Sequence, residues 1–309
     1  MFYLKINIRL FVIIPAVVCI LSSCAAKGAP PQQEKKQEEA KKQIQYEVPK
    51  AEPVKPLKSG LAASLPWERD EKFLKAQKDL GVTQRMAAFQ TVLRDPLPGE
   101  EYNVHLAAGK LAGTVVGSGE IFSQNRTLGP YTEERGFREG PVYIGTELKK
   151  TIGGGICKVA STLYNVTVYS NLEVMERHPH GMPVPYVPYG QDATVSYGTY
   201  DFKFRNNTGH PILIWSQGVD NVLYMAFYGK TAPGEVAWHH QTLETRKAPV
   251  IYRQNPALPA GSRKQVLEGM DGAVVKSWVT IRAPGGKSVD KQLGISQYEP
   301  MAFVIEQGK

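Results

Sequence analysis

Two runs of β-branched and aromatic residues constrain the fold of this chain most. They are "FKFRNNTGHPILIWSQ" (202–217) and "VLYMAFYG" (222–229), and "GVDN" separates them. Strand-forming residues on both sides of a turn-forming tetrapeptide predict a β-hairpin. Further strand-like segments precede the pair, namely "NVHLAAG", "TVVGSGEIFS" and "ATVSYG". The part of the chain after Asn103 is therefore expected to be rich in β-structure.

Helical spacing is concentrated in two other regions. Residues 67–100 are expected to be a short helical segment, because two groups of apolar residues recur there at helical intervals and "DPLPG" then stops the pattern. The groups are Phe73, Leu74 and Leu80, and, after a candidate N-cap at Thr83, Met86, Phe89, Gln90 and Leu93.

The main helix is expected over 157–171, directly after a run of three glycines. Val159, Leu163 and Val166, with Tyr169, would form its buried stripe. Its β-branched residues have low helix propensity, so tertiary packing must hold it. The fold class expected for 101–235 is thus a β-rich α+β domain with one main helix after a glycine turn.

The composition changes near residue 236. The tail from there to residue 309 contains short alternating strands punctuated by glycines, so we expect a separate, small all-β module over 236–309.

The first 66 residues are expected to secrete and tether the protein. Lys5 and Arg9 precede an apolar run that ends in Leu21-Ser22-Ser23-Cys24, a pattern typical of a bacterial lipoprotein signal over 1–23. Cys24 would then carry lipid and anchor the protein to the membrane outside the cytoplasm. An ordinary anchor helix is the alternative, but the apolar run is short for a span of about 20 residues. Residues 24–66, rich in Pro, Gln, Glu and Lys, would form a flexible tether.

Export leaves one thiol to explain. Of three cysteines, Cys19 lies in the signal and Cys24 would be acylated, so Cys157 remains without a partner for a disulfide. The formal charge of +8 suits an anionic surface such as a cell-wall polymer or a membrane. Nucleic acid is not expected as a partner of an exported chain.

Cys157 follows "GGG" at the expected start of the main helix. Backbone N–H groups of Gly153, Gly154 and Gly155, together with the helix dipole, would stabilise a thiolate at the first turn. The same donors could bind the oxyanion that forms when a thiolate attacks a carbonyl. A buried, inert cysteine behind a tight turn is the alternative.

A cysteine nucleophile needs a base and a group that orients the base. "ERHPHGMPVPYVPYGQDATVSYG" (176–198) offers His178 or His180 as the base and Asp192 as the orienting group. Extended geometry before a proline would project both histidines to the same side. The alternative is a zinc site that uses Cys157, His178 and His180. The candidate substrate-binding residues are Arg177, Tyr197 and Ser161.

Residues 103–230 resemble the VanW domain family. The resemblance is carried by "GGGICKVASTLYNVTVYSNLEVMERHPHGMPVPYVPYGQDATVSYGTYDFKFRNNTGHPI" and by "NVHLAAGKLAGTVVGSGEIFSQNRTLGPYTEERGFREGPVYI" upstream. The commoner form has Gln in place of Lys158 and Ser-Thr-Thr at 160–162. The tail, through its glycines and "ISQYEPMAFVIEQG", resembles the G-five domain, whose members are thought to adhere to peptidoglycan-type sugars.

The resemblance implies a function at the cell wall. VanW takes its name from vancomycin-resistance gene clusters, which gives no mechanism, but some VanW domains are reported to be L,D-transpeptidases. Cys157 would then attack a peptidoglycan stem peptide and pass the acyl group to a neighbouring stem, with no cofactor. The N–H groups of Gly154, Gly155 and Cys157 would bind the oxyanion. The partners would be stem peptides, glycan and, through Cys24, the membrane. A non-catalytic peptidoglycan-binding lipoprotein remains the alternative, with the zinc site third.

Overall fold

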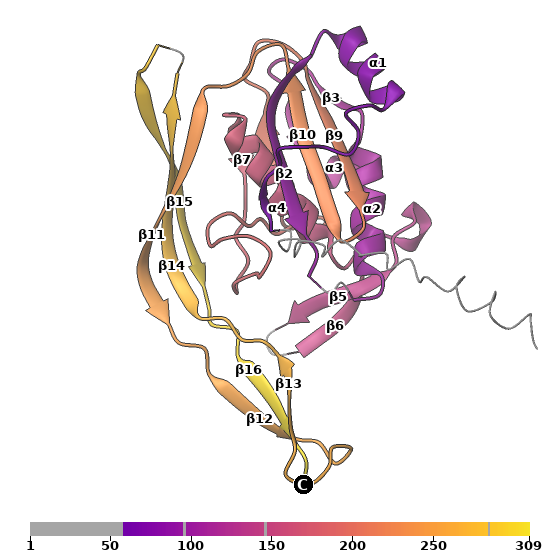
Figure 1. Ribbon diagram of the computed structural model, residues 1–309, viewed down its shortest axis with the longest axis vertical. Helices are drawn as coiled ribbons and strands as arrows, with labels where there is room; N and C mark the ends of the chain where they lie inside the picture. Colours follow the sequence, from indigo (N-terminus) through magenta and orange to yellow (C-terminus); the bar gives the residue numbers. More distant parts are fainter. Residues whose placement is uncertain (1–57, 95–96, 145–146, 284) are drawn as a thin grey trace, which may run out of the picture. The chain divides into compact units, whose positions relative to one another are not determined.

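The computed structural model describes residues 58–94, 97–144, 147–283 and 285–309 (Figure 1). The predicted signal, the predicted lipidation site at Cys24 and most of the predicted tether lie outside these residues. The folded part begins earlier than expected, because strand β1 (Gly60–Leu61) pairs with the central sheet and Leu65 is buried. Within the described ranges, no helix is both long and apolar enough to cross a membrane.

A five-stranded antiparallel sheet forms the centre of the first part of the chain. Its order is β1-β2-β10-β9-β3, with β2 at Gln84–Val92, β3 at Thr114–Val116, β9 at Ile212–Val219 and β10 at Val222–Gly229. The predicted hairpin is confirmed as β9 and β10, joined at a turn in which Asp220 adopts a positive φ of 47°.

The prediction of a helix from Thr83 is wrong. Residues 84–92 form strand β2, which pairs with β10 along its whole length and with β1 at its other edge. Met86, Phe89 and Leu93 fit a helical repeat, but they also fit a buried strand whose two faces both meet packed layers. Only the first of the two predicted helical groups in this segment forms a helix, α1 (Glu71–Leu80). Asp70 caps this helix by accepting a hydrogen bond from the N–H of Phe73 at 2.8 Å.

The expected strand at 103–109 is instead part of a second long helix, α2 (Glu100–Leu111). Val104, Ala107, Ala108 and Leu111 are fully buried and follow the i, i+3, i+4, i+7 spacing of one helix face. The fold therefore has two substantial helices on the domain core where one was expected.

The expected main helix is confirmed as α4 (Ile156–Tyr169), and its stripe of Val159, Leu163 and Val166 is fully buried. Helices α2 and α4 contact each other and cover one face of the sheet. Helix α1 covers the opposite face, where Phe73 packs against Trp215 and Tyr228 (Figure 1). Successive side chains of β10 point to opposite faces of the sheet, so they pack alternately into the two layers.

Smaller elements surround this core. A three-stranded sheet has the order β4-β8-β7, formed by Ile121–Ser123, Lys203–Arg205 and Glu173–Glu176. The short helix α3 (Gln124–Leu128) and the 3-10 turn η2 (Glu133–Arg135) lead to the hairpin of β5 (Glu139–Ile144) and β6 (Glu147–Ile152). The segment "ATVSYG", expected as a strand, makes only isolated bridges at Thr194 and Ser196.

The tail contains strands and no helix among its described residues. One sheet has the order β11-β14-β15, formed by Glu235–Arg246, Gly272–Arg282 and Ser288–Tyr298. The other has the order β12-β16-β13, formed by Val250–Gln254, Phe303–Gln307 and Arg263–Leu267. Trp238 of β11 joins the aromatic core by packing edge-on against Tyr164 and Tyr169 of α4. The β-rich α+β class is thus confirmed.

Candidate functional site

The glycine run before α4 is a close-packing device. Gly155, the N-cap, has a φ of 99°, which an L side chain rarely adopts. A Cβ at Gly154 would collide with the backbone of Gly140 in β5. Asn103, fully buried on α2, holds this segment because its Nδ2 donates to the Gly154 carbonyl at 3.0 Å. The run therefore fixes where α4 begins and where Cys157 lies.

The expected oxyanion donors need a correction. The N–H of Gly153 donates to the Arg138 carbonyl at 3.0 Å, and that of Gly154 donates to the Thr151 carbonyl at 3.1 Å. Both groups are therefore occupied. Within the described chain, no backbone oxygen accepts from the N–H groups of Gly155 and Cys157. These two donors at the first turn of α4 are the ones free to bind an anion.

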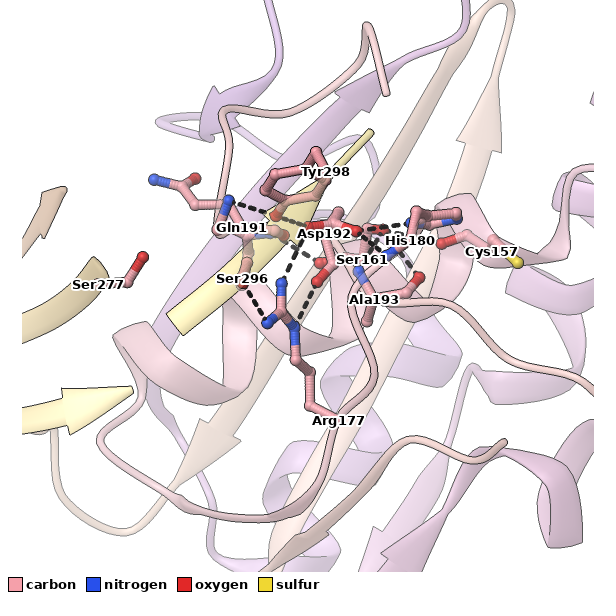
Figure 2. A network of polar contacts seen from close by, with 12 residues as sticks. Cys157, Ser161, Arg177, His180, Gln191, Asp192, Ala193, Ser277, Ser296 and Tyr298 are labelled. Carbon is pink, nitrogen blue, oxygen red and sulfur yellow. Dashed lines mark hydrogen bonds and ion pairs between the residues drawn. The ribbon is translucent and has the colours of Figure 1, made fainter. Parts of the chain in front are cut away.

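Cys157, His180 and Asp192 lie together (Figure 2). Asp192 Oδ2 accepts from the backbone N–H of His180 at 2.7 Å and lies 2.6 Å from its Nδ1. This bond leaves Nε2 of the imidazole free of Asp192, and the Cys157 thiol lies near enough to the ring for each group to shift the pKa of the other. Thiol, imidazole and carboxylate are thus in the order that activates a cysteine nucleophile.

Electrostatics favour an ion pair at this site. Burial disfavours the thiolate, but the hydrogen bond and positive charge of His180 prevail and lower the pKa of Cys157 from 9.0 to about 7. Burial likewise disfavours the imidazolium, but Asp192 and Cys157 raise the pKa of His180 from 6.5 to about 9. His180 and Arg177 outweigh burial at Asp192 and hold the pKa of that carboxyl below its ordinary value. Between about pH 7 and pH 9 the site therefore favours thiolate and imidazolium together.

The pH dependence of alkylation tests this pair. The iodoacetamide rate at Cys157 should be half-maximal near pH 7, because the thiolate reacts and is lost by protonation below the thiol pKa. The rate should level off by about pH 8, whereas free glutathione, the control, continues to accelerate at higher pH. His180→Gln should move the midpoint upward. A wild-type midpoint equal to that of glutathione would contradict the ion pair.

Arg177 lies behind Asp192 instead of at the thiol. Its Nη2 donates to Asp192 Oδ1 at 2.9 Å and its Nε donates to the Asp192 carbonyl at 2.7 Å. The third nitrogen, Nη1, donates to Ser296 Oγ at 2.7 Å. With all three nitrogens engaged inside the protein, Arg177 holds Asp192 in place, which differs from the expected role of binding substrate (Figure 2).

Ser161 is also internal. It is fully buried one turn after Cys157, where its Oγ donates to the Cys157 carbonyl at 2.9 Å and accepts from the Ala193 N–H at 2.9 Å. It therefore joins α4 to the segment that carries Asp192, and its position differs from the expected contact with substrate.

Three residues near the thiol carry no signal in the sequence. Thr194 Oγ1 lies 3.4 Å from the Cys157 Sγ, and the Val195 carbonyl oxygen lies 3.6 Å from it. Tyr186 is buried nearby, with its hydroxyl 3.4 Å from Ser161 Oγ, and burial beside Cys157 raises its pKa well above the ordinary value. The Lys158 ammonium, which forms an ion pair with Glu100, lies 4.9 Å over the Tyr186 ring.

The two histidines do not share a side. His178 Nε2 lies 3.1 Å from Glu176 Oε1, and its ring packs against Tyr200. The expectation that both imidazoles project together is wrong, because the chain leaves extended pairing after His178. In the described chain, no three His, Cys, Asp or Glu side chains gather as metal ligands, so His178 does not complete a zinc site with Cys157 and His180.

Tyr197 faces an open hollow of about 460 Å³. Tyr197 is 54% exposed, and Tyr200, Glu176 and Lys203 also line the hollow. Because Val195 contacts the thiol and Tyr197 is two residues further on, the same loop lines the hollow and borders Cys157. A ligand in this hollow would therefore have both aromatic and charged groups within reach.

Residues 99–228 match the family described as "VanW like protein". The chain is 36% identical over 146 residues to the uncharacterized protein YoaR of Bacillus subtilis, covering 47% of this chain and 48% of YoaR. It is 27% identical over 153 residues to the vancomycin B-type resistance protein VanW of Enterococcus faecalis, covering 48% of this chain and 54% of VanW. The chain thus spans about half the length of these relatives.

Solved structures of two G5 domains are also similar to part of the chain. The IgA1 protease G5 domain covers 24% of this chain and 90% of its own, with 18% identity and a TM-score of 0.17. HP0197-G5 covers 24% of this chain and 100% of its own, with 19% identity and a TM-score of 0.15. Scores at this level carry no argument about fold or function.

Proposed function

We propose that this protein is a cell-envelope acyl transferase that acts on peptidoglycan stem peptides through Cys157. The observation that carries the proposal is the Cys157–His180–Asp192 arrangement, in which the pKa of the thiol is lowered to about 7. A merely structural cysteine would need neither a protonated histidine nor the buried carboxylate behind it. If the protein only bound the cell wall, this arrangement of side chains would have no function.

The reaction would proceed in two halves. The Cys157 thiolate attacks the carbonyl carbon before the terminal D-amino acid, and the N–H groups of Gly155 and Cys157 bind the resulting oxyanion. The His180 imidazolium gives its proton to the departing amine, which leaves a thioester and a neutral imidazole. The imidazole then takes a proton from the amine of a second stem as that amine attacks the thioester. This step releases the cross-linked product and restores the thiolate and the imidazolium.

The substrate and the location follow from the same proposal. We place the donor stem in the hollow beside Tyr197, where the ion pair of Lys203 with Glu176 (2.7 Å) presents charges of both signs to the polar groups of a stem peptide. We place the protein outside the cytoplasm, attached to the bacterial membrane by lipid on Cys24. The positive net charge of +8 would favour the anionic wall and membrane as surroundings.

Mass spectrometry of the intact full chain tests the proposal. Incubation with a disaccharide-tetrapeptide should add the mass of the muropeptide less one D-amino acid, and peptide mapping should locate the addition on Cys157. The corresponding disaccharide-tripeptide, which lacks the leaving residue, is the matched control and should add nothing. If Cys157 reacts with iodoacetamide at pH 7.5 in the same sample, but the tetrapeptide gives no adduct and no 3-3 cross-linked product, the proposal is wrong.

A further inference from the structure

Strand β15 of the C-terminal part reaches the site. Ser296 and Tyr298 are alternate residues of this strand, so they lie on one face, and both are almost fully buried. The Tyr298 hydroxyl donates to Asp192 Oδ1 at 2.5 Å and accepts from the Gly190 N–H at 2.7 Å. Ser296 Oγ accepts from Arg177 at 2.7 Å, and Arg177 in turn holds Asp192 (Figure 2).

A second connection runs through strand β11. His240 Nε2 lies 2.9 Å from Gln191 Nε2, and His240 Nδ1 lies 3.0 Å from Ser277 Oγ on β14. Burial, with His239 nearby, lowers the pKa of His240, so its imidazole is neutral. A neutral ring can accept from the amide of Gln191 at Nε2 while Nδ1–H donates to Ser277.

Three consecutive residues are therefore held by side chains of the C-terminal strands. Gly190 is held at its N–H, Gln191 at its amide and Asp192 at its carboxylate. The hydrogen bonds from Tyr298 and Arg177 occupy Oδ1 of Asp192, which leaves Oδ2 to receive both bonds from His180. The carboxylate cannot rotate away from His180 without breaking these bonds.

We propose that the C-terminal β-strands complete the catalytic centre, with Tyr298, Ser296 and His240 as positioning residues that fix Asp192 and, through it, His180 beside Cys157. This inference rests on the proposed function, in which Cys157 is the nucleophile. The VanW match ends at residue 228, so the part of the chain that it covers lacks all three of these side chains.

Adhesion between two parts of the chain does not by itself explain these contacts. Trp238 already supplies an apolar contact, with ring centroids 5.4 Å from Tyr164 and 5.6 Å from Tyr169. Tyr298 packs its ring against Tyr189 at 5.3 Å, independently of its hydroxyl. Aromatic packing serves cohesion, whereas the hydroxyl groups of Ser296 and Tyr298 are directed at the carboxylate and its arginine.

Tyr298→Phe removes the hydroxyl and keeps the ring, so it tests positioning separately from packing. We expect kcat for cross-linking to fall about 10- to 100-fold with KM unchanged, because a misplaced supporting group affects the reacting geometry. We also expect the midpoint of Cys157 alkylation to rise by about half a pH unit or more, because a loosely held imidazolium stabilises the thiolate less. The charged or titratable groups around Cys157 and His180 are Asp192, Tyr131 and Tyr186, with Arg177 and Tyr298 behind Asp192.

Two further variants make the test decisive. Tyr252→Phe removes the hydroxyl of an exposed tyrosine on β12 and should change neither kcat nor the alkylation midpoint. Ser296→Ala should shift both quantities in the same direction as Tyr298→Phe, by a smaller amount, because Arg177 keeps its bonds to Asp192.

The alkylation assay separates failure of this inference from failure of the proposed function. If wild type forms the acyl adduct and Tyr298→Phe matches it in kcat and in alkylation midpoint, the positioning role is overturned. If wild type forms no adduct but Tyr298→Phe still shifts the midpoint, the strands do position the thiol and histidine, and only the proposed chemistry fails. The urea concentration at which half of the protein is unfolded should be the same for Tyr298→Phe and wild type, which shows that the variant remains folded.

Discussion

Cys157→Ala should abolish acyl transfer, with cross-linking falling by about 10³-fold or more, because no other group at the site can form the thioester. The cross-linking rate of His180→Ala should fall to nearly the same residual value, since the thiolate and its proton donor act as one unit. The double variant should be no slower than either single variant. Initial rates of 3-3 cross-link formation on purified tetrapeptide muropeptides measure all three.

The neighbouring histidine provides the control. His178 pairs with Glu176 and Tyr200, so His178→Ala should keep a rate within several-fold of wild type. Circular dichroism should show the same fold for each variant. A His178→Ala rate as low as that of His180→Ala would contradict the assignment of His180, and an active Cys157→Ala protein would contradict the nucleophile.

Asp192→Ala should destabilise the fold by about 3–5 kcal/mol, because it removes one partner of a buried ion pair. The Asp192 side chain is 1% exposed and that of Arg177 is 10% exposed, so the guanidinium would lose its counter-charge where water barely reaches it. The hydroxyl of Tyr298 and the backbone N–H of His180 would also lose their acceptor. Urea unfolding at pH 7, followed by tryptophan fluorescence, gives the change in the free energy of unfolding.

An exposed carboxylate supplies the comparison. Glu244 forms an ion pair with Arg246 on the surface of β11, where solvent screens the interaction. The free energy of unfolding of Glu244→Ala should therefore stay close to that of wild type. Equal destabilisation by the two substitutions would show that the Asp192 bonds add nothing to stability. Asp192→Asn keeps the shape of the side chain and loses its charge, so its free energy of unfolding should lie between those of wild type and Asp192→Ala.

The fold could be predicted from the sequence where local pattern and tertiary environment agree. The hairpin of β9 and β10 and helix α4 have patterns that permit one reading each, and both are confirmed. Strand β2 was predicted as a helix because Met86, Phe89 and Leu93 satisfy a helical repeat, while its neighbours β1 and β10 lie 23 or more residues away in sequence. The residues of α2 were read as a strand although Ala107 and Ala108, both fully buried in the helix, belong to the residue type with the highest helix propensity.

The candidate site was predictable in its residue types and not in its arrangement. Cys157 was singled out by elimination and by the glycines, and the pattern "HPH" made both histidines equal candidates. The choice of His180 depends on the fold of 178–194, in which Asp192 binds the backbone of His180 as well as its ring. The glycines before Cys157 were expected to present N–H groups, but the N–H of Gly153 donates to the Arg138 carbonyl and that of Gly154 closes the turn on the Thr151 carbonyl. No local signal marks Ser296 or Tyr298.

The bond between Tyr298 and Asp192 joins residues 106 positions apart in the chain. Contacts between residues so distant in sequence form slowly, because a large loop must close before they are made. The Asp192 carboxylate is therefore fully fixed only after the last long strands have docked. Until then the pKa of the Cys157 thiol is higher, so less of it is thiolate near neutral pH. The arrangement would thus make full reactivity of Cys157 depend on the completion of folding.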